Sequence, residues 1–367
     1  MAKEKSADIR HILSRRCALQ GIPVTGIFEL TPRCNLRCKM CYVRLTPAQM
    51  APIGRELTAA EWLEIAQSAK DAGMIFLLIT GGEPTLRQDF PEIYEGLAQM
   101  GFSISINTNG TLITPALRAL WRQLPPAQVN ITLYGTSRED YGALCGEPDA
   151  FDRVLDALSW LKQEGIMIHL NTTIAPENSH RWQEIEAFAK NLDLELRMTT
   201  YCFPPARRFE CGSCTDFERI SPELAAELTV RDMLYRDGPD ALKRRAASLS
   251  APPQADCELE VGELMQCMAG RSQFWMTWDG RMTPCGMLPT PQVRPMEQGF
   301  AAAWEQLHQV TKEIRLCPDC VNCAERKTCM NCAAVIYTET GTFTGKPEYM
   351  CRMNQAYREC LKKLAEE

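Results

Sequence analysis

The stretch Thr31-Pro32-Arg33-Cys34-Asn35-Leu36-Arg37-Cys38-Lys39-Met40-Cys41 carries three cysteines with the spacing C-x3-C-x2-C. It follows a short apolar run, Val24–Leu30, that we interpret as a strand. Three thiolates so close together can bind one soft metal centre. A cubane iron–sulfur cluster takes four ligands, so three cysteines leave one iron open to a ligand that is not protein. A structural zinc site completed by a distant fourth ligand is the alternative that these residues leave open.

The composition, with 45% apolar and 23% charged residues, is typical of a globular protein. The length of 367 residues allows one large domain and a smaller one. A net charge of −6 predicts neither nucleic acid nor an anionic membrane as partner. No apolar run approaches the roughly 18 residues of a transmembrane helix, and the charged start, Met1–Ser6, lacks the apolar region of an export signal. Eighteen cysteines in such a chain indicate a reducing, cytoplasmic location where thiols bind metals.

Short β-rich runs alternate with amphipathic helices from about residue 24 to 200. We expect six strands, at residues 24–30, 74–80, 102–107, 129–134, 166–172 and 194–199. Among the helices between them, one is opened by a capping box of Thr58 and Glu61 and ends at Gly73. Six consecutive units of this kind predict a parallel sheet with right-handed crossovers, either doubly wound or an incomplete barrel.

Polar and metal-binding segments follow the first three of these strands. The cysteine triad follows the first strand, Gly81-Gly82-Glu83-Pro84 follows the second, and Asn107-Thr108-Asn109-Gly110 ends the third. Because ligands gather at the carboxyl ends of parallel strands, we expect the three segments to meet at one rim. The two glycines permit close backbone approach to a ligand, and the two asparagines offer amide donors and acceptors.

In combination, these segments resemble the radical S-adenosylmethionine (radical SAM) enzymes over about residues 24–200. The resemblance implies a partial (β/α)6 barrel in which Cys34, Cys38 and Cys41 hold a [4Fe–4S] cluster that binds S-adenosylmethionine. In that family the cofactor is cleaved reductively to methionine and a 5′-deoxyadenosyl radical, which abstracts a hydrogen atom from the substrate. The family often has an aromatic residue before the third cysteine, where this chain has Met40, whose thioether can pack against the adenine ring. The cofactor-binding residues that the resemblance implies are Met40, Tyr42, Gly81, Gly82, Glu83, Pro84, Asn107, Asn109, Thr132, Tyr134 and Asn171.

The chain is expected to divide into an N-terminal segment (residues 1–23), the barrel (24–200), a bridging region (201–256) and a cysteine-rich domain (257–367). The bridge contains a helix opened by Ser221-Pro222-Glu223, and the last domain ends in a helix over about Asn354–Leu364. Long periodic segments are otherwise rare after residue 256, so we expect metal to hold this region more than a hydrophobic core does.

The C-terminal cysteines resemble the SPASM extension of peptide- and protein-modifying radical SAM enzymes. The resemblance implies two auxiliary [4Fe–4S] clusters, hence three in all. Their ligands would be Cys320, Cys323, Cys329 and Cys351 for one cluster, and Cys257, Cys267, Cys285 and Cys332 for the other. Cys317 begins a ferredoxin-like run and is an alternative ligand, and a zinc ribbon is the alternative for the paired motifs. Cys202, Cys211 and Cys214 follow the sixth strand and are candidates to face the site.

The sequence therefore predicts a radical SAM enzyme that modifies a peptide or protein by oxidation, cross-link or thioether formation. Gly286 follows Cys285, where sulfatase-maturing enzymes carry aspartate, which argues against formylglycine formation. A flavodoxin or ferredoxin is the expected electron donor. Because only about 23 residues precede the first strand, a separate leader-peptide recognition protein is a further expected partner. The alternatives are radical oxidation or epimerisation of a small molecule, and a non-catalytic iron–sulfur electron carrier or scaffold.

Overall fold

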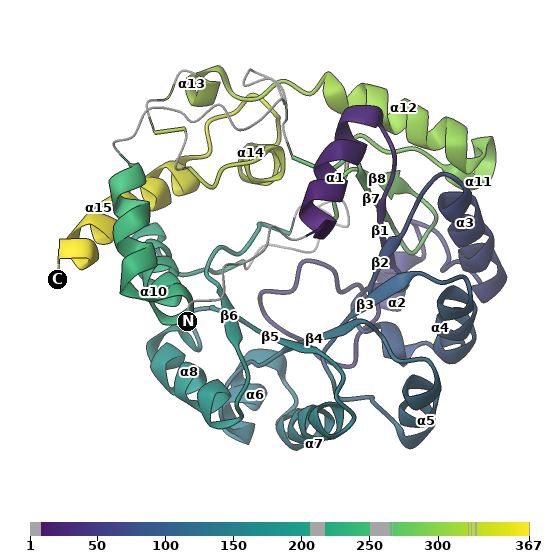
Figure 1. Cartoon of the computed structure of the whole chain (residues 1–367), viewed down its shortest axis with the longest axis horizontal. Coiled ribbons are helices and arrows are strands. Elements are labelled where there is room, and N and C mark those ends of the chain that lie inside the picture. The colour runs from purple at the N-terminus through teal and green to yellow at the C-terminus, as the bar shows by residue number, and fades with distance from the viewer. Residues whose placement is uncertain are drawn as a thin grey trace.

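The computed structural model describes residues 9–205, 217–249, 265, 267–321, 323, 325–326 and 329–366. Within these residues, one sheet has eight strands in the order β6-β5-β4-β3-β2-β1-β7-β8 (Figure 1). The strands are β1 (Thr25–Glu29), β2 (Phe76–Thr80), β3 (Ser103–Thr108), β4 (Gln128–Thr132), β5 (Ile168–Thr173), β6 (Leu196–Thr199), β7 (Gln273–Met276) and β8 (Met282–Thr283). Strands β1 to β6 are paired in parallel, so the six predicted βα units are confirmed.

Helices cover the outside of this curved sheet (Figure 1). The fold is therefore a partial barrel and not a doubly wound sheet, which has helices on both faces. The helices of the barrel half are α1 (Ile9–Gln20), α2 (Pro47–Met50), α3 (Ala59–Asp71), α4 (Phe90–Gln99), α5 (Pro115–Gln123), α6 (Arg138–Cys145), α7 (Ala150–Gln163) and α8 (Trp182–Asn191), with 3-10 turns η1 (Pro84–Leu86) and η2 (Ser179–Arg181).

The main core lies between the outer face of the sheet and these helices. Phe28 on β1 is fully buried, and its ring lies 5.0 Å from that of Trp62 on α3. Burying one side chain of this size contributes roughly 1.5–3 kcal/mol. The predicted capping box opens α3, because the Thr58 hydroxyl accepts from the Glu61 amide and the Glu61 carboxylate accepts from the Thr58 amide. Local cap and long-range packing thus fix the same helix.

The C-terminal part differs from the expectation that metal would hold it. Strand β7 pairs in parallel with β1 and extends the barrel sheet. Phe274 on β7 is fully buried in the main core, 5.2 Å from the ring of Phe300 and 6.1 Å from that of Trp304. Much of the region is therefore stabilised by apolar packing. Its helices are α11 (Pro295–Gln298), α12 (Phe300–Lys312), α13 (Pro318–Val321), α14 (Ala333–Thr340) and α15 (Glu348–Glu366).

The predicted bridging helix is α10 (Pro222–Ser248), capped by the Ser221 hydroxyl and interrupted at Gly238, whose φ is 77°. It packs against α15, where Tyr357 and Leu361 are buried in a second apolar cluster. Helix α15, at Glu348–Glu366, is longer than the predicted final helix, which spanned about Asn354–Leu364. Helix α10 also covers the edge of the sheet, because the buried Asp232 carboxylate accepts from the Met198 amide of β6 at 3.1 Å. This bond occupies a backbone donor that an edge strand otherwise exposes.

Candidate active site

A cavity of about 370 Å3 opens at the carboxyl ends of the strands. It brings the three predicted rim segments together, as expected. The predicted residues that line it are Cys34, Cys38, Met40, Cys41, Tyr42, Gly81, Gly82, Asn107, Asn109, Thr132, Tyr134 and Asn171. Residues that line it and were not predicted as cofactor ligands include Asn130, Thr173, Thr199, Tyr201, Cys202, Phe203 and Met287. Cys202 was a candidate to face the site, and it does.

The glycine loop packs directly against the backbone that leads into the cysteine triad. The Gly82 amide donates to the Thr31 carbonyl at 2.7 Å, and the Glu83 amide donates to the Arg33 carbonyl at 2.9 Å. A Cβ atom at Gly81 would lie 2.5 Å from the Thr31 carbonyl oxygen, and one at Gly82 would lie 2.4 Å from that of Arg33. Such contacts are far inside van der Waals distance. Both positions therefore require glycine for packing against the protein itself, in addition to any ligand.

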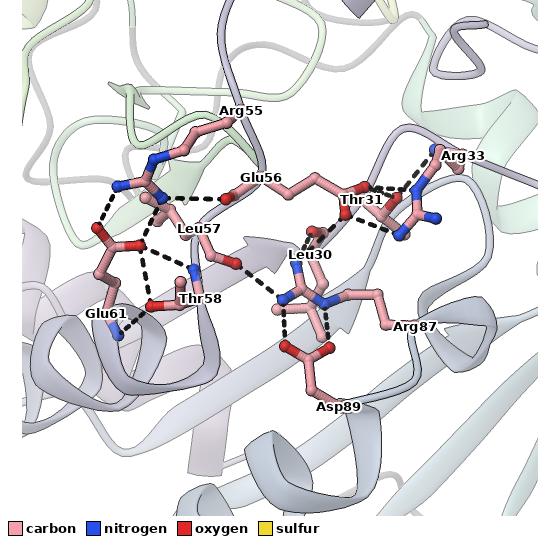
Figure 2. A network of polar contacts seen from close by, with 10 residues as sticks. All are labelled: Leu30, Thr31, Arg33, Arg55, Glu56, Leu57, Thr58, Glu61, Arg87 and Asp89. Atoms are coloured by element: carbon pink, nitrogen blue, oxygen red, sulfur yellow. Dashed lines mark hydrogen bonds and ion pairs between the residues drawn. The ribbon is translucent and has the colours of Figure 1, made fainter. Parts of the chain in front are cut away.

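A polar network fixes the outer side of the same segment, as Figure 2 shows. Glu56 accepts from the Thr31 hydroxyl and from Arg33, whose Nε and Nη2 lie 2.8 and 2.7 Å from its oxygens. A bidentate arginine–carboxylate pair of this kind restricts geometry strongly. The residues just before Cys34 are held from two sides.

Arg87 joins that segment to the start of α3. Its guanidinium is buried and donates to the carbonyls of Leu30 and Leu57 at 2.9 and 2.8 Å and to Asp89 at 2.6 Å (Figure 2). The Arg87 hydrogen bond holds the pKa of the Asp89 carboxyl below its usual value. No local pattern marked Arg87 in the sequence, because its partners lie in separate loops.

Hydrogen-bond donors surround the three cysteine sulfurs. The Leu36 amide lies 3.4 Å from the Cys34 sulfur, and the Arg44 amide lies 3.3 Å from that of Cys41. Tyr134, predicted as a cofactor residue, forms a side-chain hydrogen bond with Cys38. Ligand thiolates of iron–sulfur clusters are commonly stabilised by such donors.

The thiols themselves favour binding to a cation. Burial, with smaller contributions from Glu83, Cys41 and Cys38, raises the pKa of the Cys34 thiol to about 12. Three neighbouring thiols therefore ionise together only when positive charge is supplied, as a metal centre does. The donor set fits an iron–sulfur cluster with one iron left for a non-protein ligand.

Glu83 and Pro84 lie behind the cavity wall, although both were predicted to bind the cofactor. Glu83 is fully buried, and its carboxylate accepts from the Asn109 amide at 2.7 Å, the Thr108 hydroxyl at 2.8 Å and the side chain of Thr85. Burial raises the pKa of this carboxyl, and the hydrogen bonds oppose the shift. Glu83 connects the glycine loop to the end of β3.

The described auxiliary-ligand candidates form two groups. Cys267 lies close enough to Cys285 and Cys332 to interact with both thiols electrostatically. The second group joins Cys320, Cys323, Cys329 and Cys351 through similar mutual interactions. Cys317 also belongs to it, because its thiol contacts Cys320, so the alternative ligand stays open. Cys257, Cys211 and Cys214 lie outside the described residues.

The described residues present neither a site for a single metal ion nor a membrane-spanning helix. No three histidine, cysteine, aspartate or glutamate side chains among them are arranged to hold a single metal ion. Cluster ligands bind separate iron atoms and need not meet at one point. None of the described helices is both long enough and apolar enough to cross a membrane.

Residues 28–189 match the radical SAM superfamily. The chain carries a radical SAM domain. S-adenosylmethionine and [4Fe–4S] are the cofactors of this superfamily, so the predicted radical SAM domain, barrel and cofactors are confirmed, whereas the SPASM extension stays a prediction. The number of clusters and the identity of the substrate stay predictions.

The chain is 26% identical over 347 residues to an AdoMet-dependent heme synthase of Methanosarcina barkeri, covering 90% of this chain and 97% of that protein. The fold is similar to Streptococcus suis SuiB bound to its precursor peptide SuiA, with a TM-score of 0.66, 15% identity and coverage of 96% of this chain and 82% of SuiB. It is also similar to anSMEcpe with bound AdoMet and the Cp18Cys peptide, with a TM-score of 0.64, 14% identity and coverage of 93% and 98%.

Proposed function

We propose that this chain is a radical SAM enzyme that abstracts a hydrogen atom from a peptide or protein substrate and carries three [4Fe–4S] clusters. The observation that carries the proposal is the single cavity onto which the cysteine triad, the glycine loop and an uncharged polar wall all open. A non-catalytic electron carrier gives no reason for a ligand cavity beside the cysteines. The arrangement therefore favours an enzyme.

The cofactors have candidate ligands on this rim. Cys34, Cys38 and Cys41 would hold the first cluster, and the Gly81–Gly82 backbone, Thr132 and Asn171 would bind S-adenosylmethionine. When bound, this pair supplies a 5′-deoxyadenosyl radical. The protein residues orient the substrate and exclude water. A flavodoxin or ferredoxin is the proposed electron donor.

The auxiliary clusters belong to the same proposal. One would be held by Cys320, Cys323, Cys329 and Cys351, and the other by Cys267, Cys285 and Cys332 together with Cys257. The grouping of the described thiols supports this division.

The residues of the cavity wall favour a substrate whose reacting group is uncharged. Among its described residues there is no aspartate, glutamate, lysine, arginine or histidine side chain. Thr173, Thr199 and Tyr201 present neutral polar groups beside Phe203 and Met287. A buried charge requires a partner of opposite charge, whereas an amide or aliphatic group needs only hydrogen bonds or apolar contact. The peptide complexes of SuiB and anSMEcpe, which share this fold, support a peptide substrate.

A second candidate is a radical oxidation in the formation of a haem-type product. It is favoured by the similarity to AdoMet-dependent heme synthase, which extends over nearly the full length of both chains. Porphyrins carry several carboxylates, which the described cavity wall does not pair. Titration with haem, followed by its absorbance, tests this candidate. Tight, stoichiometric binding with a shifted Soret band would favour it over the peptide proposal.

Anaerobic reconstitution tests the enzyme proposal directly. The iron-loaded protein is incubated with S-adenosylmethionine and dithionite, and 5′-deoxyadenosine is measured. We expect its release, and we expect simultaneous substitution of Cys34, Cys38 and Cys41 by alanine to abolish it while leaving roughly eight of about twelve irons. A fully iron-loaded wild-type protein that releases none would refute the proposal. The triple variant also serves as the matched control for cofactor breakdown by dithionite alone.

A further inference from the structure

The side chain of Asn109 was predicted to bind the cofactor, but the protein already uses its entire hydrogen-bonding capacity. A carboxamide has two N–H donors and two acceptor lone pairs. Nδ2 of Asn109 donates to Asn35 Oδ1 at 2.9 Å and points at the Cys34 sulfur at 3.7 Å. Oδ1 accepts from the amide and the hydroxyl of Thr111 at 2.9 and 2.6 Å. The structure therefore assigns this side chain to Cys34 and not to the ribose or carboxylate of the cofactor.

Asn109 is held rigidly in this position. It is buried, and its own backbone amide donates to the fully buried Glu83 carboxylate at 2.7 Å. The Asn35 amide closes the ring by donating to the Thr111 hydroxyl at 2.8 Å. Five hydrogen bonds to buried or half-buried partners thus fix the direction of the N–H group that faces the sulfur.

A hydrogen-bond donor that is held beside a ligand thiolate changes the reduction potential of the cluster that the thiolate binds. Reduction adds one negative charge to an iron–sulfur cluster, and the positive end of an N–H dipole stabilises that charge. Hydrogen bonds to the cluster sulfurs accordingly help to set the reduction potential. Removing such a donor should make the cluster harder to reduce.

We propose that Asn109 is a positioning residue that donates a hydrogen bond to the Cys34 thiolate and thereby raises the reduction potential of the first cluster. The inference rests on the proposed function, because it requires a cluster at Cys34, Cys38 and Cys41. It assigns Asn109 a role in electron uptake that is separate from cofactor binding.

The first test measures the midpoint potential of the cluster by a redox titration monitored by electron paramagnetic resonance. In Asn109→Ser the hydroxyl is too short to reach the sulfur, and no charge is introduced. The matched control is Asn130→Ser, the same change at a neighbouring residue that lines the cavity and bonds to Asn107 at 2.7 Å. We expect a more negative midpoint in Asn109→Ser and no shift in Asn130→Ser. Equal potentials in all three proteins would overturn the proposal.

The second test uses the wild-type protein and therefore does not depend on the folding of a variant. Wild-type protein is prepared with asparagine labelled with 15N only in its side-chain amide, and the reduced cluster is examined by electron–nuclear double resonance. We expect a 15N hyperfine coupling, and its absence in a loaded, reduced cluster would overturn this inference alone. A wild-type protein that assembles no cluster would overturn the proposed function together with it. The two failures are therefore distinguishable.

Discussion

Each of the strands β1 to β6 buries at least one apolar side chain, whereas the described part of the segment between α12 and α14 buries almost none. Phe28, Ile79, Ile106 and Ile131 are each fully buried on successive strands. Of the described residues between 315 and 332, only Cys317 is buried. That segment nevertheless carries five cysteines. The two regions use different means to offset the conformational entropy of folding.

The difference in apolar packing does not follow the boundary between the barrel and the C-terminal domain. Residues 273–307 contribute to the main core, and α15 forms its own core with α10. The described part of the short cysteine-rich segment has little such packing, with Leu316, Cys329 and Cys332 only partly buried against apolar clusters. Its order should therefore depend on metal, while the flanking elements should not.

Removal of iron should affect the two regions differently, and this is the largest effect that we expect. We expect an anaerobic chelator to abolish hydrogen-exchange protection in the described residues of 315–332 while leaving β2 and β3 protected. Hydrogen exchange followed by mass spectrometry measures both regions in one sample, and the same chelator pre-loaded with iron is the control. If β2 and β3 lose protection to the same extent, metal stabilises the barrel too, and the proposed difference between the two regions is wrong.

Phe274 tests whether the first C-terminal elements belong to the barrel core. The residue is fully buried between β1 and α12, so Phe274→Ala should destabilise the chain by about 3–5 kcal/mol. Urea unfolding should show one transition that includes both the barrel and residues 273–307. Met296→Ala, at a side chain that is 40% exposed, is the control and should change the stability by less than about 0.5 kcal/mol. A second, separate transition in the Phe274 variant would mean that the two parts fold independently.

The local signals of the sequence were sufficient for the barrel. Apolar runs, the capping box of α3 and glycine at the ends of helices gave all six parallel strands within two residues at each end. The convergence of Cys34, Gly81 and Asn107 on one cavity also followed, because strand order fixes which loops share a rim. These features depend on short-range pattern plus one topological rule.

Features that depend on contacts between distant segments were missed. Strand β7 has only four residues, and nothing in them marks β1 as its partner. The hydrogen bonds that Glu83 and Asn109 form within the protein were missed for a similar reason. An amide in a turn beside a predicted ligand site is equally suited to the ligand or to the protein, and only the positions of Asn35, Thr111 and Cys34 decide between them.

The smallest expected effect concerns the cap of α3, on the barrel side of the comparison. The Arg55 hydrogen bond, followed by the bond from the Thr58 amide, lowers the pKa of Glu61 from 4.5 to about 2. The capping box is therefore fully formed above pH 4.5 and weakens as the pH falls towards 2.

At pH 7, Thr58→Ala should cost about 1 kcal/mol, and Thr58→Ser, which keeps the hydroxyl, should cost much less. Urea unfolding measures the free energy of unfolding of both variants, and the loss should appear in the transition of the barrel. Hydrogen-exchange protection of the described residues between 315 and 332 should be unchanged. Equal stability of the alanine and serine variants would show that the core alone determines where α3 begins.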